Sequence, residues 1–126
     1  MNKLVFIVDD SVTVRASVEY TLKKAGYTVM SAVDGQDGIE KLESLDKEGK
    51  RPAMIISDIN MPRLDGIGFI KAIKQKPAFK FIPVLVLTTE SQEKKKLEGK
   101  QAGAAGWLVK PFQPEQLIGV VKKFVR

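Results

Sequence analysis

The sequence predicts an α/β fold of the doubly wound kind, in which five parallel strands alternate with five helices. Two observations favour this class. Short apolar runs recur along the chain, and segments with the spacing of amphipathic helices separate them. Runs such as FIV and VLVL are apolar at every position, which suits parallel strands buried on both faces. We therefore expect a (βα)5 sheet covered by helices on both sides.

The five apolar runs are the predicted strands. Each lies between turn residues, prolines or charged residues, and all have the length of ordinary strands. In chain order they are Leu4–Val8, Thr28–Ala32, Ala53–Ser57, Pro83–Leu87 and Gly106–Val109.

The first two helices follow recognisable start and stop signals. Ser11 can cap a helix that continues to about Ala25, where Gly26 is well placed as its stop. The pair Asp34-Gly35 is predicted to form a turn before the second helix. The apolar face of that second helix is predicted to consist of Ile39, Leu42 and Leu45.

The last three helices differ in the apolar surface that they offer. The third follows the loop INMPRLDG and ends near Lys74, and it is predicted to bury Phe69, Ile70 and Ile73. The fourth, Ser91–Ala102, has only Leu97 and Ala102 as apolar contacts, so we expect it to be the least firmly packed. Pro114 suits the first turn of the last helix. The residues of that helix predicted to point inward are Leu117, Ile118, Val121 and Phe124.

Composition excludes several classes of site. The chain has no Cys and no His, so disulfides, thiolate metal sites and imidazole bases are all excluded. Its chemistry must depend on carboxylates, hydroxyls and lysines. A length of 126 residues fits one domain over residues 1–126. The chain shows no signal peptide and no apolar run near the ~20 residues of a membrane span, so we expect a cytoplasmic protein without membrane insertion.

The net charge of +6 is unevenly distributed. Residues 1–65 carry 9 basic and 11 acidic groups, whereas residues 66–126 carry 12 basic and 4 acidic groups. A basic half could bind nucleic acid or an acidic protein. However, only four of the 21 basic residues are Arg, the residue on which base recognition leans most heavily. We therefore favour a solvated lysine surface and expect no nucleic-acid partner.

Reactive side chains follow four of the five predicted strands: Asp9-Asp10, Asp58, Thr88 and Lys110. The carboxyl ends of parallel strands lie along one edge of a sheet, which is the usual ligand site. Each residue also has a simpler explanation. Asp10 and Thr88 could cap helices, Asp58 could belong to a turn, and Lys110 could be a surface residue. Their joint occurrence at four strand ends favours a site.

Three carboxylates close together repel one another, and one lysine cannot neutralise them all. A divalent cation is therefore expected, and a set of oxygen ligands favours Mg²⁺, with Mn²⁺ as a substitute. Asp58 is the candidate nucleophile, because a carboxylate can accept a phosphoryl group as an acyl phosphate. Lys110 would offset the charge on the transferred oxygens, and the Thr88 hydroxyl could donate a hydrogen bond to them.

Four motifs together resemble the receiver domain of two-component response regulators. They are IVDDS, SDINMPRLDG, VLTTE and AGAAGWLVKPF, and their order and spacing match the family over essentially the whole chain. The resemblance implies the flavodoxin-like fold of CheY-like receivers, with strand order 2-1-3-4-5. It also implies that a histidine kinase phosphorylates Asp58 in trans, since this chain has no His.

The resemblance further implies a set of metal ligands. Asp10 and Asp58 would bind Mg²⁺ through their side chains, and Asn60 would bind it through its backbone carbonyl. Asp9 would act mainly through a water molecule.

The remaining roles concern switching and the lifetime of the phosphoryl group. Thr88 resembles the switch hydroxyl, and Trp107 stands where the family usually has Tyr or Phe. Asn60 and Glu90 occupy positions that tune the acyl-phosphate lifetime. Lys110 resembles the phosphate-contacting lysine, and its bond to Pro111 is expected to be cis.

Only the last helix follows Phe112, so we expect the output to be binding of a partner rather than catalytic turnover of an external substrate. The motifs look most like those of chemotaxis regulators. The expected partner is a flagellar motor switch protein, or another effector, on the face formed by the fourth helix, fifth strand and last helix. A phosphatase is a further possible partner, and an acidic partner segment would suit the basic half of the chain.

Three other functions are weighed against this one. A stand-alone receiver could instead be a phosphorelay intermediate or a phosphate sink. A metal-dependent phosphatase would need a D-x-D pattern after the first strand, where this chain has DDSV. A flavodoxin-like cofactor binder would need a phosphate loop rich in Ser and Thr at the same place, so both of these are disfavoured.

Overall fold

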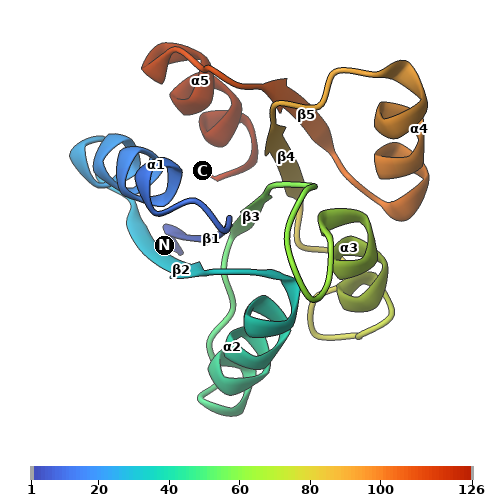
Figure 1. Ribbon diagram of the computed structural model, residues 1–126. Helices are drawn as coiled ribbons and strands as arrows, with labels where there is room; N and C mark the ends of the chain where they lie inside the picture. Colours follow the sequence, from blue (N-terminus) through green and yellow to red (C-terminus); the bar gives the residue numbers. More distant parts are fainter. Residues whose placement is uncertain (1, 126) are drawn as a thin grey trace.

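The computed structural model describes residues 2–125 and confirms the predicted fold class (Figure 1). The elements are β1 (Leu4–Val8), α1 (Val12–Lys24), β2 (Thr28–Ala32), α2 (Gly35–Lys47), β3 (Met54–Ser57), α3 (Gly66–Lys74), β4 (Val84–Thr88), α4 (Glu93–Ala102), β5 (Gly106–Val109) and α5 (Pro114–Phe124). All strand pairs are parallel, and the sheet order is β2-β1-β3-β4-β5.

The sheet separates two apolar cores. Helices α1 and α5 cover one face, while α2, α3 and α4 lie on the other (Figure 1). Successive residues of β1 alternate between the two: Val5 and Ile7 face α1 and α5, whereas Phe6 and Val8 face the opposite core. Every residue of β3 and β4 is buried, as expected for uninterrupted apolar runs. Each fully buried aliphatic or aromatic side chain contributes about 1.5–3 kcal/mol to stability.

The expected signals delimit α1. The Ser11 hydroxyl accepts a hydrogen bond from the Val14 N–H at 3.2 Å, and the helix ends before Gly26. Gly26 has a φ of 96°, a left-handed conformation that glycine adopts without strain.

Two strands and one helix differ slightly from their predicted bounds. β3 begins at Met54 rather than Ala53, and α4 begins at Glu93 rather than Ser91. β4 begins at Val84 rather than Pro83 and continues to Thr88, one residue further than predicted. The reason is that the Thr88 carbonyl accepts a hydrogen bond from the Lys110 N–H at 2.8 Å, which prolongs the ladder with β5.

The predicted turn at Asp34-Gly35 is wrong. Asp34 is the N-cap of α2, and its carboxylate accepts a hydrogen bond from the Asp37 N–H at 2.8 Å. Gly35 is already the first residue of the helix. An Asx side chain before Gly suits a turn as well as a cap, and here the helix uses it as a cap.

Two side chains that were predicted to point inward do not. Leu97 is 55% exposed, because α4 contacts the sheet through Gly99 and Ala102, and a residue two positions from Gly99 lies on the opposite side of a helix. Phe124 is 36% exposed, because the chain leaves the helix there and Val125 occupies the buried position instead. Within residues 2–125, no helix is long and apolar enough to cross a membrane.

Candidate functional site

The ends of β1, β3, β4 and β5 lie along one edge of the sheet, and backbone hydrogen bonds between neighbouring strands continue one residue past β3 and past β5. The Asp58 N–H donates to the Val8 carbonyl at 2.9 Å, and the Lys110 N–H donates to the Thr88 carbonyl at 2.8 Å. Asp58 therefore follows β3 directly beside the end of β1. Lys110 leaves β5 beside the end of β4.

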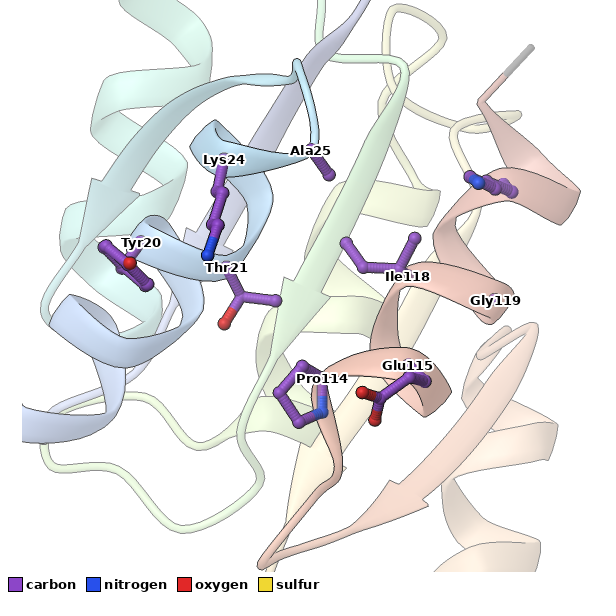
Figure 2. A pocket seen from close by; sticks show the side chains of 9 residues that line it. Tyr20, Thr21, Lys24, Ala25, Pro114, Glu115, Ile118 and Gly119 are labelled. Atoms are coloured by element: carbon purple, nitrogen blue, oxygen red, sulfur yellow. The ribbon is translucent and has the colours of Figure 1, made fainter.

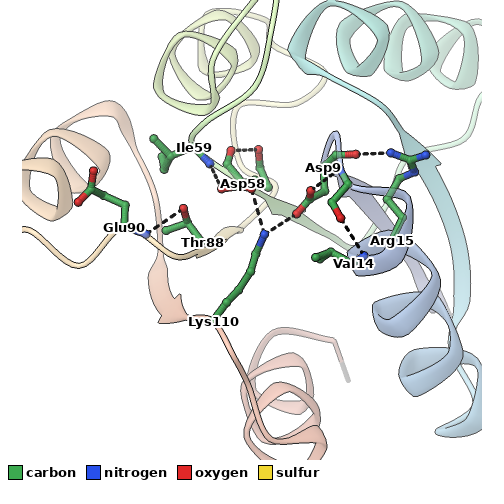
Figure 3. Close-up of polar contacts among 10 residues, drawn as sticks. Asp9, Val14, Arg15, Asp58, Ile59, Thr88, Glu90 and Lys110 are labelled. Atoms are coloured by element: carbon green, nitrogen blue, oxygen red, sulfur yellow. Dashed lines mark hydrogen bonds and ion pairs between the residues drawn. The ribbon is translucent and has the colours of Figure 1, made fainter.

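The Lys110 ammonium joins two carboxylates at this edge (Figure 3). Its Nζ lies 2.9 Å from Asp9 Oδ2 and 3.0 Å from Asp58 Oδ2, and the two carboxylate side chains are only 3% and 10% exposed. Burial lowers the pKa of Lys110, but hydrogen bonds and charge attraction from both aspartates outweigh it and raise the pKa overall. The lysine therefore stays charged at neutral pH. The Lys110–Pro111 bond is cis.

Asp9 is held by the Ser11 N–H and the Arg15 guanidinium as well as by Lys110. Burial raises its pKa, although the Ser11 N–H, 2.9 Å from Oδ1, and the Lys110 ammonium both oppose that rise. The Arg15 guanidinium donates to the Asp9 backbone carbonyl at 2.6 Å. Asp9 is thus fixed at both its backbone and its side chain.

Asp58 is fixed in a similar way. Its Oδ1 accepts a hydrogen bond from the Ile59 N–H at 2.6 Å, and its backbone carbonyl accepts one from the Ser57 hydroxyl at 2.8 Å. The first residue of α3, Gly66, packs directly on the same carbonyl, where a Cβ atom would overlap the oxygen. Only glycine allows α3 to begin so close to the site.

The structure places three acidic residues where they could hold a cation. Asp9, Asp10 and Asp58 each offer a carboxylate oxygen, and these oxygens lie within 4.8 Å of one another. Asp10 is exposed, so the cluster opens to solvent. The Asn60 carbonyl nearby accepts none of the hydrogen bonds found among residues 2–125. A set of oxygen donors with one lysine as counter-charge fits Mg²⁺ or Mn²⁺.

Thr88, Glu90 and Trp107 form a connected group beside the cluster. The buried Thr88 hydroxyl accepts a hydrogen bond from the Glu90 N–H at 3.3 Å. The Trp107 indole donates to the Glu90 carbonyl at 2.9 Å, and its ring packs on Gly99 of α4. The backbone of Glu90 therefore links the hydroxyl to the indole.

The simpler roles considered for Asp10 and Thr88 are excluded. Ser11 is the N-cap of α1, and Gln92 is the N-cap of α4. Neither Asp10 nor Thr88 is needed to begin a helix.

Two arginines near this edge were missed from the sequence. Arg15 stands four residues after the cap of α1, a helical spacing that could have indicated that it reaches back to the end of β1. Arg63 forms an ion pair with Asp34 and adopts a left-handed backbone with a φ of 65°. A non-glycine residue in this conformation is uncommon and has no sequence signal.

Two cavities flank α1. One of about 460 Å³ lies beside Lys110 and is lined by Phe112 and by the α1 residues Val14 and Ser17. The other, of about 550 Å³, lies further along between α1 and α5, away from the carboxylates (Figure 2). Of these two cavities, the first has a residue of the site, Lys110, in its lining.

Comparison with known proteins identifies the family. The family described as response regulator receiver domain matches residues 5–122. The chain belongs to the response regulator receiver family. This receiver domain is also similar to the crystallised chemotaxis protein CheY4 of Vibrio cholerae, with 43% sequence identity and a TM-score of 0.90. The match covers 99% of this chain and 100% of that one.

Similar proteins differ in how much of their own length this chain spans. The receiver domain is 39% identical to protein PilG of Pseudomonas aeruginosa, over 96% of this chain and 86% of that protein. It is 33% identical to chemotaxis protein CheY1 of Helicobacter pylori, over 88% of this chain and 87% of that protein. It is also 33% identical to the Bacillus subtilis regulatory protein PhoP, of which it spans only 50%.

Proposed function

We propose that this receiver domain accepts a phosphoryl group on Asp58 from a histidine kinase and then binds a partner in chemotaxis. The observation that carries the proposal is the contact of the Lys110 ammonium with Asp58, 3.0 Å away, inside a cluster of three carboxylates. This arrangement joins a nucleophile, a fixed positive charge and a candidate cation site at one sheet edge.

The transfer is a direct displacement. An Asp58 carboxylate oxygen forms a bond to phosphorus as the P–N bond of the kinase phosphohistidine breaks, and the released imidazole takes a proton from solvent. Lys110 offsets the negative charge of the transferred oxygens. Bound Mg²⁺, held by Asp9, Asp10, Asp58 and the Asn60 carbonyl, would supply further positive charge there. The domain is a phosphoacceptor in this proposal and turns over no external substrate.

The conformational change that follows phosphorylation involves the connected residues Thr88, Glu90 and Trp107. Once the phosphoryl group is in place, the Thr88 hydroxyl gives up its contact with the Glu90 N–H and donates to a phosphoryl oxygen. Because Glu90 also accepts the Trp107 indole hydrogen bond, its displacement changes the position of the ring and of α4. The face formed by α4, β5 and α5 then binds its partner, which we propose to be a flagellar motor switch protein. The similarity to CheY4 and CheY1 supports this choice.

Intact mass spectrometry tests the transfer. The protein is incubated with Mg²⁺ and acetyl phosphate, and wild type is compared with Asp58→Asn and with a control, Asp46→Asn. The control removes an acid that forms an exposed ion pair with Arg51 and is not part of the carboxylate cluster. One phosphoryl group is expected on wild type and on Asp46→Asn, and none on Asp58→Asn. A phosphoryl group on Asp58→Asn, or a wild type unmodified by acetyl phosphate and histidine kinases alike, would contradict the proposal.

A further inference from the structure

Arg63 and Asp34 form the most directional ion pair near the site. Arg63 Nε lies 2.7 Å from Asp34 Oδ2, and a terminal guanidinium nitrogen lies 2.9 Å from Oδ1. The guanidinium therefore binds the carboxylate in a bidentate manner. Asp34 is 4% exposed, and the guanidinium holds the pKa of its carboxyl below the usual range. The pair therefore joins the start of α2 firmly to the loop of residues 59–65.

That loop carries Asn60, whose carbonyl is a candidate cation ligand. Apart from the ion pair, only one backbone hydrogen bond among the described residues joins the loop to α2, between the Gly35 N–H and the Leu64 carbonyl at 3.3 Å. Within the loop, the Gly66 N–H donates to Ile59 and the Leu64 N–H donates to Pro62. On the side of β3 the segment is held by Ile59, which is buried in the core, so the ion pair of Arg63 adds a second attachment on the side of α2.

We propose that Arg63 is a positioning residue for the cation site. By holding the loop against Asp34, it keeps the Asn60 carbonyl available to a divalent cation bound by the carboxylate cluster, and so sets the Mg²⁺ affinity. This inference rests on the proposed function, because it assumes that the cluster binds Mg²⁺. Arg63 makes this ion pair from a left-handed backbone conformation with a φ of 65°, which is uncommon for a residue other than glycine.

The direction of the effect distinguishes positioning from simple electrostatics. Removing a positive charge near a cation site strengthens cation binding by Coulomb attraction alone. Removing a group that holds a ligand in place weakens binding. A loss of Mg²⁺ affinity on removal of Arg63 therefore identifies a positioning role.

The test uses substitutions that preserve the local backbone. Arg63→Asn keeps a residue that tolerates the left-handed conformation, and Asp34→Asn keeps a side chain able to cap α2. The two single variants, the double variant and Arg51→Asn are compared. Arg51→Asn is the control, because it removes one positive charge from an exposed pair with Asp46 at 3.6 Å. The Mg²⁺ dissociation constant of each folded protein is measured by titration calorimetry.

We expect wild type and Arg51→Asn to bind Mg²⁺ equally. Arg63→Asn and Asp34→Asn should each raise the dissociation constant about 3- to 10-fold, less than the loss of a group bonded directly to a ligand. The double variant should be no weaker than the single variants, because both remove one interaction. Unchanged or tighter binding by Arg63→Asn, or additive effects, would overturn the inference while leaving the proposed function intact. A wild type that binds no Mg²⁺ would overturn both.

Discussion

The Lys110 ammonium lies between two nearly buried carboxylates, 2.9 Å from Asp9 and 3.0 Å from Asp58. Burying three charged groups is costly, and their mutual attraction offsets much of that cost only while all three are present. Removing the lysine is therefore expected to cost more free energy of unfolding than the net stabilisation that the two ion pairs contribute. Without it, two negative charges would face each other at low exposure.

Replacing Lys110 by Ala should lower the free energy of unfolding by about 3 kcal/mol at neutral pH, because the two carboxylates lose their counter-charge. Urea denaturation followed by circular dichroism measures the change. Lys50→Ala is the matched control, since Lys50 belongs to an exposed pair with Glu48 and its loss should change stability by less than about 0.5 kcal/mol. Equal stability of the two variants would show that the carboxylates do not depend on Lys110.

The pH dependence of the same comparison has a definite sign. The folded-state pKa of Lys110 lies above its ordinary value of 10.5, so its stabilising contribution is complete below that value and disappears as the pH rises through the folded-state pKa. At the acid side, the raised pKa of Asp9 lets this carboxyl take up a proton earlier than an ordinary aspartate. The difference in free energy of unfolding between wild type and Lys110→Ala should therefore become smaller above about pH 10.5 and also on acidification.

At the scale of secondary-structure elements, α4 is joined to β5 through an unusual contact. The Trp107 ring packs on Gly99, and the indole N–H donates to the Glu90 carbonyl in the segment that leads into the helix. The only buried residues of α4 are Gly99 and Ala102. A helix attached through small residues and one ring can move when that ring moves, which suits the switching role proposed above.

Gly99→Ala should destabilise the protein by about 1–2 kcal/mol, although alanine is the better helix former, because the new methyl group would lie 2.7 Å from the indole ring. The fluorescence of Trp107, the only tryptophan of the chain, should change as well. Thermal and urea unfolding together with the emission spectrum measure both effects.

Gly119→Ala is the control within another helix. A Cβ atom at Gly119 in α5 meets nothing within 4 Å, so alanine should stabilise the protein by about 0.5–1 kcal/mol and leave the emission spectrum unchanged. If both alanines stabilise equally, Trp107 does not pack against Gly99 as described.

The elements themselves were largely predictable, because the apolar runs and helix signals are local. Three strands have their predicted bounds, whereas the end of β4 depends on its partner β5, which a local pattern does not include. Leu97 and Phe124 were misplaced for a related reason: an apolar side chain indicates that a helix has a packing face, but tertiary contacts decide which face it is.

The candidate site was predictable to a similar degree. The residues after the strands could be named because parallel topology brings strand ends together. The ion pair of Arg63 with Asp34 could not be foreseen, since it depends on a left-handed backbone in a loop and on a partner 29 positions away.

For the whole molecule, the carboxylate cluster should couple cation binding to stability. An unfolded chain does not hold the three oxygens within 4.8 Å, so the Mg²⁺ proposed to bind them would bind the folded state preferentially. The free energy of unfolding should rise with Mg²⁺ concentration, by about 2.7 kcal/mol at 100 times the dissociation constant. Urea unfolding at increasing MgCl₂ measures this, with NaCl at equal ionic strength and Asp10→Asn as controls. An equal rise with NaCl, or in Asp10→Asn, would exclude the cluster as its cause.

The large sequence separation of Lys110 from Asp9 and Asp58 has a consequence for when the site can form. Lys110 follows Asp9 by 101 positions and Asp58 by 52, and β5 must take its place in the sheet before the ammonium reaches either carboxylate. A nascent, truncated or misfolded chain lacks the assembled site, so it cannot undergo the phosphoryl transfer proposed for this site. The signalling proposed above therefore requires a chain that has been synthesised and folded through β5.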